Sequence, residues 1–468
     1  MKILYGGLTE AHNILIKGAM ENLGYEVEPL PTPDNEALEI GKRFCNKGQC
    51  NPTYYTVGNL LKYLLQKGED REKLQREYIF VTVGSCGPCR FGMYEMEYRK
   101  ALREAGFPDF KVIAIEQSSA MLEELAAEGL KFDRNFFMNL LRAVMLGDLL
   151  NDIYYKVKPY EVEPDSTDLW REESLNILYE TLKGGGSLKK SLKRVKELLD
   201  RVKVNYFQPK PKVKITGEFF AQTTEGDGNY RLAKWLIEEG AEPIVEPVTT
   251  WVDYLIYEKI LETKERAFKN RLKTFKLLLA LKFLRTYLRF QYNLYRRWLG
   301  NKPDPLKEQE KIARYAAPYY NPRLVGGEGH MEVGKHILMV KEKKAHMVVS
   351  VKPFGCMPST QSDGVQAKVV EDLGGSLFVS VETSGDAEAN VKSRILMTLY
   401  EAKMRALEEF ERAKEELSIE VGEIERALRE KGEITKASLP LPHRYTTTAA
   451  NALFYLKRSI GKTLKLPF

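Results

Sequence analysis

The chain has 468 residues and a net charge of +7, with 43% hydrophobic and 29% charged residues. These proportions are typical of a globular protein with two to four domains and ample material for their cores. Because the excess charge is small and Lys and Arg are interspersed with Glu, the composition does not indicate a nucleic-acid partner. The N-terminus lacks the long apolar stretch of a signal peptide, so we expect a cytoplasmic protein with no membrane partner.

Strands and helices are predicted to alternate through the first part of the chain, as in a parallel α/β unit. Strands are predicted over residues 2–5, 25–30, 78–83 and 111–115, and helices over 10–23, 53–67, 91–105 and about 119–156. The turn after the first strand does not match G-x-G-x-x-G, so no dinucleotide site is predicted. Residues 41–52 are rich in turn formers and are predicted to be a loop.

A second α/β unit is predicted to start at residue 212, after a segment with two proline-bearing breaks and three consecutive glycines. Its predicted elements are strands from 212 and over 243–248, 337–353 and 377–381, and helices over 228–239, 360–373, from about 387 and over 447–460. The predicted fold class is therefore α/β, with two α/β domains that contain parallel sheets, a helical insertion and a helical C-terminal region. The predicted boundaries are 1–157 and 212–400 for the two domains, 158–211 for a helical linker, 254–320 for the insertion and 401–468 for the C-terminal helices.

Residues 254–299 are predicted to form one or two long helices, because leucines and tyrosines recur at i+3 and i+4 spacing. Lys282, Arg285 and Arg289 interrupt any apolar stretch of about 20 residues, which excludes a transmembrane helix. We expect a helical layer packed on a domain rather than a membrane-surface helix or a partner-docking helix.

All five cysteines lie in predicted loops, and clustered thiols in a reducing compartment more often bind metal or carry out redox chemistry than form disulfides. The five are Cys45, Cys50, Cys86, Cys89 and Cys356. Cys86 and Cys89 follow a predicted strand and precede a predicted helix, at the strand end where open α/β sheets bind ligands. Cys356 repeats this arrangement in the second unit.

The spacing of the thiols alone leaves four interpretations open. Cys45, Cys50, Cys86 and Cys89 form two pairs that would suit a structural zinc site. An iron–sulfur cluster, a redox-active thiol pair and unlinked structural cysteines are the alternatives. The fifth thiol favours the iron–sulfur cluster, because a closed zinc site would have no use for Cys356, whereas a cluster held between two domains would.

Residues 326–336 contain two histidines and a near match to a P-loop. His330 and His336 are predicted to be polar loop residues rather than metal ligands. We reject an ATP site, because His336 stands where a P-loop requires Ser or Thr and no clear strand precedes the segment. Arg90, beside Cys89, is predicted to pair with an anionic ligand or offset the charge of a cluster, or else to lie at the surface or cap a helix.

The segment from Ser85 to Tyr94, SCGPCRFGMY, resembles the (S/T)CGPCRFGQY signature of proteins related to the 2-hydroxyacyl-CoA dehydratase and benzoyl-CoA reductase family. The similarity is to the branch related to dehydratase activases, which lies near the double-cubane-cluster reductases. Residues 351–358 resemble the PFxCMP loop of this branch, and residues 50–59 resemble its cysteine–proline segment, with a tyrosine where lysine is common. Residues 216–220 resemble its Gly-Glu segment, and weaker similarity covers about 2–400.

This resemblance implies an iron–sulfur cluster at the interface of two Rossmann-like domains. By position, it implies Cys50, Cys86, Cys89 and Cys356 as the first candidate ligands, with Cys45 as the fifth. A double cubane with three thiolates in each half would need six cysteines, so we expect a single 4Fe–4S cluster. The resemblance identifies no catalytic residue and no motif for binding coenzyme A.

The resemblance also implies a partner, an ATP-hydrolysing activase with its own iron–sulfur cluster, which injects a low-potential electron. The chain would then be the receiving component of a reductase or dehydratase, as a homo- or hetero-oligomer. The alternative hypothesis is a non-catalytic iron–sulfur carrier or scaffold. An open iron site beside a pocket would favour the first hypothesis, and a fully thiolate-ligated cluster would favour the second.

Overall fold

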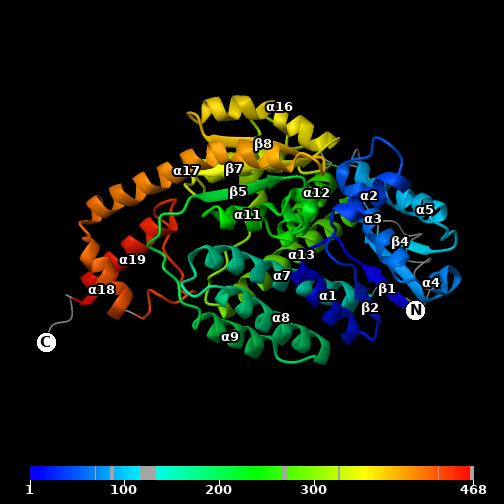
Figure 1. The fold of residues 1–468 in the computed structure, drawn as a ribbon, viewed down its shortest axis with the longest axis horizontal. Coiled ribbons are helices and arrows are strands. Elements are labelled where there is room, and N and C mark those ends of the chain that lie inside the picture. Colours follow the sequence, from blue (N-terminus) through cyan, green and yellow to red (C-terminus); the bar gives the residue numbers. More distant parts are fainter. Residues whose placement is uncertain are drawn as a thin grey trace.

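A computed structural model describes residues 1–68, 70–84, 89–115, 133–265, 271–324, 327–430 and 432–463 (Figure 1). The fold is α/β, as predicted, and is built around two four-stranded sheets in which every strand pair is parallel. The first sheet and the N-terminus lie at one end of the molecule, and the last two helices lie at the other end (Figure 1).

The first sheet has the strand order β2-β1-β3-β4. Its strands are β1 (Lys2–Tyr5), β2 (Val27–Pro29), β3 (Tyr78–Val83) and β4 (Lys111–Ile115). Ile3 pairs with Val27 on one side and with Ile79 on the other. Continuous apolar strands of this kind suit a parallel sheet, because helices cover both of its faces.

One face of the first sheet packs against α3 and α5, and the other packs against α1 and α7. The helices of this half are α1 (Glu10–Asn22), α2 (Asn35–Phe44), α3 (Asn51–Gln66), α4 (Arg71–Glu77), the 3-10 helix η1 (Arg90–Met93), α5 (Tyr94–Glu104) and α7 (Arg134–Val157).

The second sheet has the order β6-β5-β7-β8, which repeats the arrangement of the first sheet. Its strands are β5 (Lys212–Gly217), β6 (Glu242–Ile244), β7 (Met347–Pro353) and β8 (Leu377–Thr383). One face packs against α11 (Leu232–Glu238) and α17 (Glu388–Leu417). The other face is covered by α12 (Val248–Glu265), α14 (Gln309–Ala316), α15 (His330–Lys341) and α16 (Met357–Asp372).

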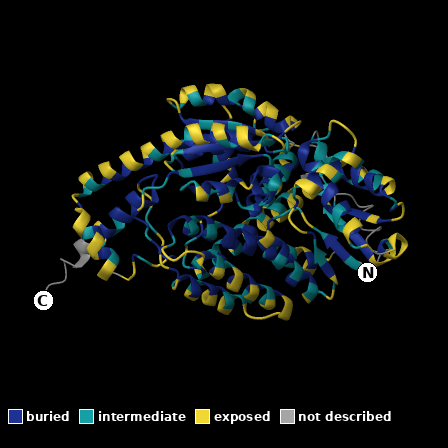
Figure 2. Cartoon of the chain, viewed as in Figure 1, coloured by how far each residue is buried: buried dark blue, intermediate teal, exposed yellow. Residues whose placement is uncertain are grey.

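The remaining elements are mainly helices that pack beside the two sheets. They are η2 (Lys158–Tyr160), α8 (Ser166–Gly184), α9 (Leu188–Leu199), α10 (Phe219–Thr223), η3 (Asp227–Asn229), α13 (Arg271–Trp298), α18 (Val421–Glu430) and α19 (Thr448–Thr463). The largest apolar core joins α1, α7, α8 and α9 with the C-terminal part of α13 and with α19. The strands of the second sheet are buried, whereas α17 carries exposed residues along its outer side (Figure 2).

Several predicted elements differ from the structure. Residues 337–341, predicted to belong to a strand, are the end of helix α15, and β7 starts only at Met347. Residues 41–44, predicted to be a loop, complete helix α2. The segment 158–211 is helical as predicted, and its helices α8 and α9 pack into the largest core. No helix within the described ranges is both long and apolar enough to cross a membrane.

Candidate metal centre

Both sheets direct the carboxyl ends of their central strands to one region. Strand β3 leads into the loop of Cys89, β7 leads into the loop of Cys356, and β5 ends at Gly217, directly before Glu218. In each sheet these strands adjoin the point where the order of connections reverses, which is where open α/β sheets bind ligands. Cys86 lies outside the described residues.

Three of the described thiols occupy the same local position, the residue immediately before a helix. Cys50 precedes α3, Cys89 precedes η1 and Cys356 precedes α16, and all three have extended backbone with φ near −70° (−70°, −69° and −73°). None of the three side chains caps the helix that follows it. The first amides of a helix lack intrahelical partners and carry partial positive charge, so these positions favour thiolates and anionic groups.

A direct contact between the two halves joins the loops of Cys50 and Cys356. The backbone N–H of Asn51 donates a hydrogen bond of 3.4 Å to the carbonyl oxygen of Phe354. Gly355 has a φ of +80°, and a β-carbon placed there would lie 3.8 Å from the Cα of Cys50. The guanidinium of Arg90 donates a hydrogen bond to the carbonyl oxygen of Gly48, so Arg90 holds the loop before Cys50.

Glu218 is the common neighbour of the three thiols. Burial raises the pKa of all three thiols, Cys50, Cys89 and Cys356, and the nearby carboxylate of Glu218 raises each pKa further. The pKa of Cys89 is raised to about 11. Glu218 is fixed by its backbone, because its N–H donates to the carbonyl oxygen of Val351 at 3.0 Å and its carboxylate accepts from the N–H of Ala221 at 2.9 Å.

Hydroxyl groups adjoin one of the thiols. The Sγ atom of Cys50 lies 3.0 Å from the hydroxyl of Tyr94 and 3.4 Å from that of Thr53, and both hydroxyls oppose the effect of burial on the pKa of Cys50. A buried thiolate also needs a positive partner to offset the cost of its burial. The donor set of three thiols at helix starts therefore fits a cationic metal centre.

The spacing of the thiols is wider than a single metal ion requires. In the part of the chain that the structure describes, only Glu161, Asp165 and Asp168 form a set of three Cys, His, Asp or Glu ligand atoms within 4.8 Å of one another. Four thiolates bound to one zinc ion at about 2.3 Å would lie about 4 Å apart. The three described thiols thus do not all lie within 4.8 Å of one another, as the ligands of a closed single-ion site would.

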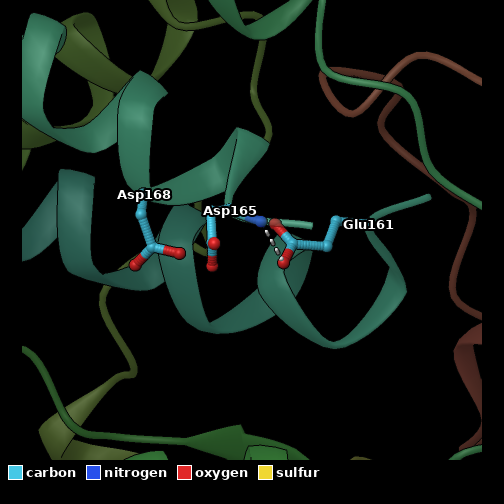
Figure 3. Close-up of side chains that lie close together, drawn as sticks. All are labelled: Glu161, Asp165 and Asp168. Atoms are coloured by element: carbon cyan, nitrogen blue, oxygen red, sulfur yellow. Dashed lines mark hydrogen bonds between the residues drawn. The ribbon is translucent and has the colours of Figure 1, made fainter. Parts of the chain in front are cut away.

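The carboxylates of Glu161, Asp165 and Asp168 already have a cation among them. Figure 3 shows the three side chains close together, with the Glu161 carboxylate accepting a hydrogen bond from the N–H of Asp165. The ammonium group of Lys158 forms ion pairs with all three carboxylates. It lies 2.5 Å from Glu161 and 3.4 Å from Asp165, and it is in close contact with Asp168. Asp165 is mostly exposed, so this group is an ion-pair network at the surface.

Cys45 lies in a different environment from the other thiols. It ends helix α2 rather than starting a helix, although its buried side chain belongs to the same apolar core as Cys50, between α3, α5 and the first sheet. Burial and the nearby Glu97 raise its pKa to about 12. Glu218 is not among the groups that shift the pKa of Cys45, whereas it raises the pKa of Cys50, Cys89 and Cys356.

Two further carboxyl groups beside the thiols were not predicted from the sequence. Glu328 accepts a hydrogen bond of 3.1 Å from the indole of Trp251, and Glu332 accepts hydrogen bonds from Ser359, at 2.8 Å, and Ser362. Burial raises the pKa of each to about 8, and it raises the pKa of Glu218 to about 7.

Helix α15 also buries both histidines that were predicted to be polar loop residues. The ring nitrogens of His330 have no hydrogen-bond partner among the described residues, and burial lowers its pKa to about 4. His336 lies 2.8 Å from Gln366 and 2.9 Å from Ser376, and its ring stacks on Phe378. Both predictions were wrong, because the apolar residues around the histidines form the buried side of a helix.

Comparison of the chain with protein-family models and with curated protein sequences gave no match.

Proposed function

We propose that this chain is a cytoplasmic iron–sulfur protein whose cluster is held between its two α/β halves by Cys50, Cys86, Cys89 and Cys356. The observation that carries the proposal is the contact between the loops of Cys50 and Cys356 across the two halves, with each of the three described thiols at the start of a helix. The chain has five cysteines, and a double cubane with three thiolates in each half would need six, which favours a single 4Fe–4S cluster. Zinc is less favoured because the three described thiols do not all lie within 4.8 Å of one another.

We further propose that the chain is the electron-accepting component of a reductase or dehydratase, as its similarity to the 2-hydroxyacyl-CoA dehydratase family suggests. Its partner would be an ATP-hydrolysing activase that carries its own cluster. When bound, the cluster would supply one-electron transfer at low potential. The raised pKa values of Glu218 and Glu328, about 7 and 8, let these side chains hold protons near neutral pH, which limits the negative charge around the thiols.

The test is the metal content of protein purified without oxygen. We expect about four irons and four sulfides per chain and an electron paramagnetic resonance signal after reduction by dithionite. Cys50→Ala and Cys356→Ala should each lose most of the iron, because each removes a thiol from the shared site. Cys45→Ala is the matched control and should keep it. Zinc without sulfide, or full iron retention in Cys356→Ala, would refute the proposal.

A non-catalytic electron carrier is the second candidate. Large apolar side chains are exposed beside the thiol loops, and Val83, Met93 and Phe354 are all more than half exposed. Exposed apolar side chains next to a redox centre suit the docking of an electron-transfer partner. A small ligand such as cyanide, added to the reduced protein, distinguishes the two. A changed resonance signal would indicate an open iron and a catalyst, and an unchanged signal would favour the carrier.

A further inference from the structure

Helix α13 has an unusual charge composition. In its 28 residues it carries eight Lys or Arg residues and no Asp or Glu. The sequence predicted that this region would pack as a layer on a domain, and its C-terminal half does so. Leu288, Tyr292 and Tyr295 are buried there, and the fully buried Asp253 pairs with Arg285 at 2.8 Å and with Arg289 at 3.1 Å.

The N-terminal half of α13 does not pack in this way. Its exposed apolar residues are Leu272, Phe275, Leu277, Leu279, Phe283 and Leu284. Phe275, Leu279 and Phe283 are 63%, 61% and 73% exposed, respectively. Monomeric globular proteins rarely leave a contiguous apolar surface of this kind uncovered, so it indicates a binding surface.

Four of these residues form one row along the helix. Leu272, Phe275, Leu279 and Phe283 are spaced by three, four and four residues, which places them on one side of an α-helix. Phe290, 57% exposed and seven residues after Phe283, continues the row. At 1.5 Å per residue, the row from Leu272 to Phe290 is about 27 Å long. We call these five residues the apolar row.

The charges beside the apolar row identify what covers it. Lys276 and Lys282 are exposed and form no ion pair with any residue that the structure describes. The two acidic residues at the end of the adjacent helix α12 are already paired, Glu262 with Lys259 at 2.9 Å and Glu265 with Arg323 at 2.7 Å. The surface around the row is therefore basic, and a second copy of α13 laid against it would bring like charges together.

A second exposed row, on helix α17, provides a contrast within the same chain. Met397, Tyr400 and Met404 are exposed at i, i+3 and i+7, but the adjacent Glu401 and Arg405 form an ion pair at 2.6 Å. That surface mixes both signs of charge, as protein surfaces commonly do. Leucine and phenylalanine flanked only by lysine are instead typical of helices that lie in the interface of an anionic bilayer.

We propose that the N-terminal half of α13 binds the surface of an anionic lipid bilayer, with the apolar row inserted below the headgroups and Lys276 and Lys282 on the lipid phosphates. Long lysine side chains can extend from the helix to the headgroups while their stems cover apolar surface. The cytoplasmic leaflet carries the anionic lipids that attract such a helix. The protein would then be peripheral to a membrane that it does not span, and this inference does not depend on the metal centre.

Sedimentation with lipid vesicles tests the proposal. The full chain should sediment with vesicles of 30% phosphatidylglycerol in phosphatidylcholine at 0.1 M NaCl. Binding should weaken at least tenfold with pure phosphatidylcholine and should fall in 0.5 M NaCl, because salt screens the lysine–phosphate attraction. The triple variant Phe275→Ser/Leu279→Ser/Phe283→Ser and the double variant Lys276→Glu/Lys282→Glu should each bind at least tenfold more weakly. These side chains are exposed, so the variants should retain the unfolding temperature of the wild type.

The row on α17 supplies the matched control. Met397→Ser/Tyr400→Ser/Met404→Ser should bind vesicles as the wild type does. Cys356→Ala should also bind as the wild type does, so that failure of the metal centre and failure of this proposal can be distinguished. Absence of binding to anionic vesicles would overturn the proposal. So would a dimer that the α13 triple variant dissociates, because it would identify the apolar row as a contact between copies of the chain.

Discussion

The backbone N–H of Asn51 lies 3.4 Å from the carbonyl oxygen of Phe354 and donates a hydrogen bond to it across the two halves of the molecule. Asn51 follows Cys50 directly, and Phe354 comes two residues before Cys356. This bond therefore couples the positions of two thiols that belong to different sheets. Substitutions that move either loop should alter the shared site without touching a thiol.

Tyr94→Phe tests the hydroxyl group that lies 3.0 Å from the Sγ atom of Cys50. We expect the variant to keep its iron but to have a lower reduction potential than the wild type. A hydrogen bond to a cluster sulfur stabilises the reduced, more negative state, and the variant lacks this bond. A redox titration followed by electron paramagnetic resonance measures the change. Tyr63→Phe, which removes a hydroxyl bonded to Glu28, is the control and should leave the potential unchanged.

Gly217→Ala should destabilise the protein strongly. Gly217 has a φ of +121°, and a β-carbon there would lie 1.9 Å from the carbonyl oxygen of Val351 in the neighbouring strand. We expect the free energy of unfolding to fall by about 3 kcal/mol or more, because strain and overlap with backbone add. Gly24 has a φ of +84° but open space around it. Gly24→Ala should therefore lower the free energy of unfolding by only about 1 kcal/mol. Urea unfolding that finds equal costs for the two variants would contradict this account.

His336 should make the protein less stable as the pH falls. Burial lowers the pKa of His336 to about 4 in the folded protein, below its usual value near 6.5. Between these values the unfolded chain takes up a proton that the folded protein does not. The contribution of His336 to the free energy of unfolding should therefore fall by about 2 kcal/mol when the pH is lowered from 7 to 5.

The variant His336→Gln isolates this contribution from other titrating groups. The cost of the substitution, measured by urea unfolding, should be about 2 kcal/mol smaller at pH 5 than at pH 7. A cost at His336 that does not depend on pH would disprove the prediction.

Asp148→Asn should weaken the contact between helices α1, α7 and α12. The buried carboxylate of Asp148 accepts hydrogen bonds from the backbone N–H of Val248 at 2.6 Å and of Thr249 at 2.8 Å, and it lies 3.2 Å from the imidazole of His12. An amide at this position would place a donor against donors, so we expect a loss of about 3 kcal/mol in the free energy of unfolding. Asp165→Asn at the surface should change the stability by less than about 0.5 kcal/mol.

The sequence predicted the strands of the first sheet better than the helices around the site. Residues 2–5, 78–83 and 111–115 are strands as predicted, because a strand buried on both faces is apolar throughout. The prediction of a strand at 337–341 was wrong, because a short apolar run looks the same whether it is a strand or the buried side of a helix.

The local form of two thiol loops could also be predicted, since Cys89 follows Pro and Cys356 follows Gly, each between an apolar strand and a helix. A site shared by Cys50 and Cys356 was expected from the sequence, but the position of Glu218 beside them could not be predicted, because it depends on how the two sheets are placed relative to each other. Glu218 did carry a local signal, since it follows a glycine at the end of a strand. Glu332 lies in helix α15 and Glu328 lies just before it. This segment was wrongly predicted to be a loop, so neither carboxyl group was expected at the site.

The division of the thiols between two halves has a consequence for protein synthesis. Cys50 and Cys89 leave the ribosome about 300 residues before Cys356, which at 5–20 residues per second corresponds to about 15–60 s. During this time the nascent chain offers thiols without the part that closes over them. Any group that these thiols bind must therefore be inserted after most of the chain has been made, or be held exposed until the second sheet folds.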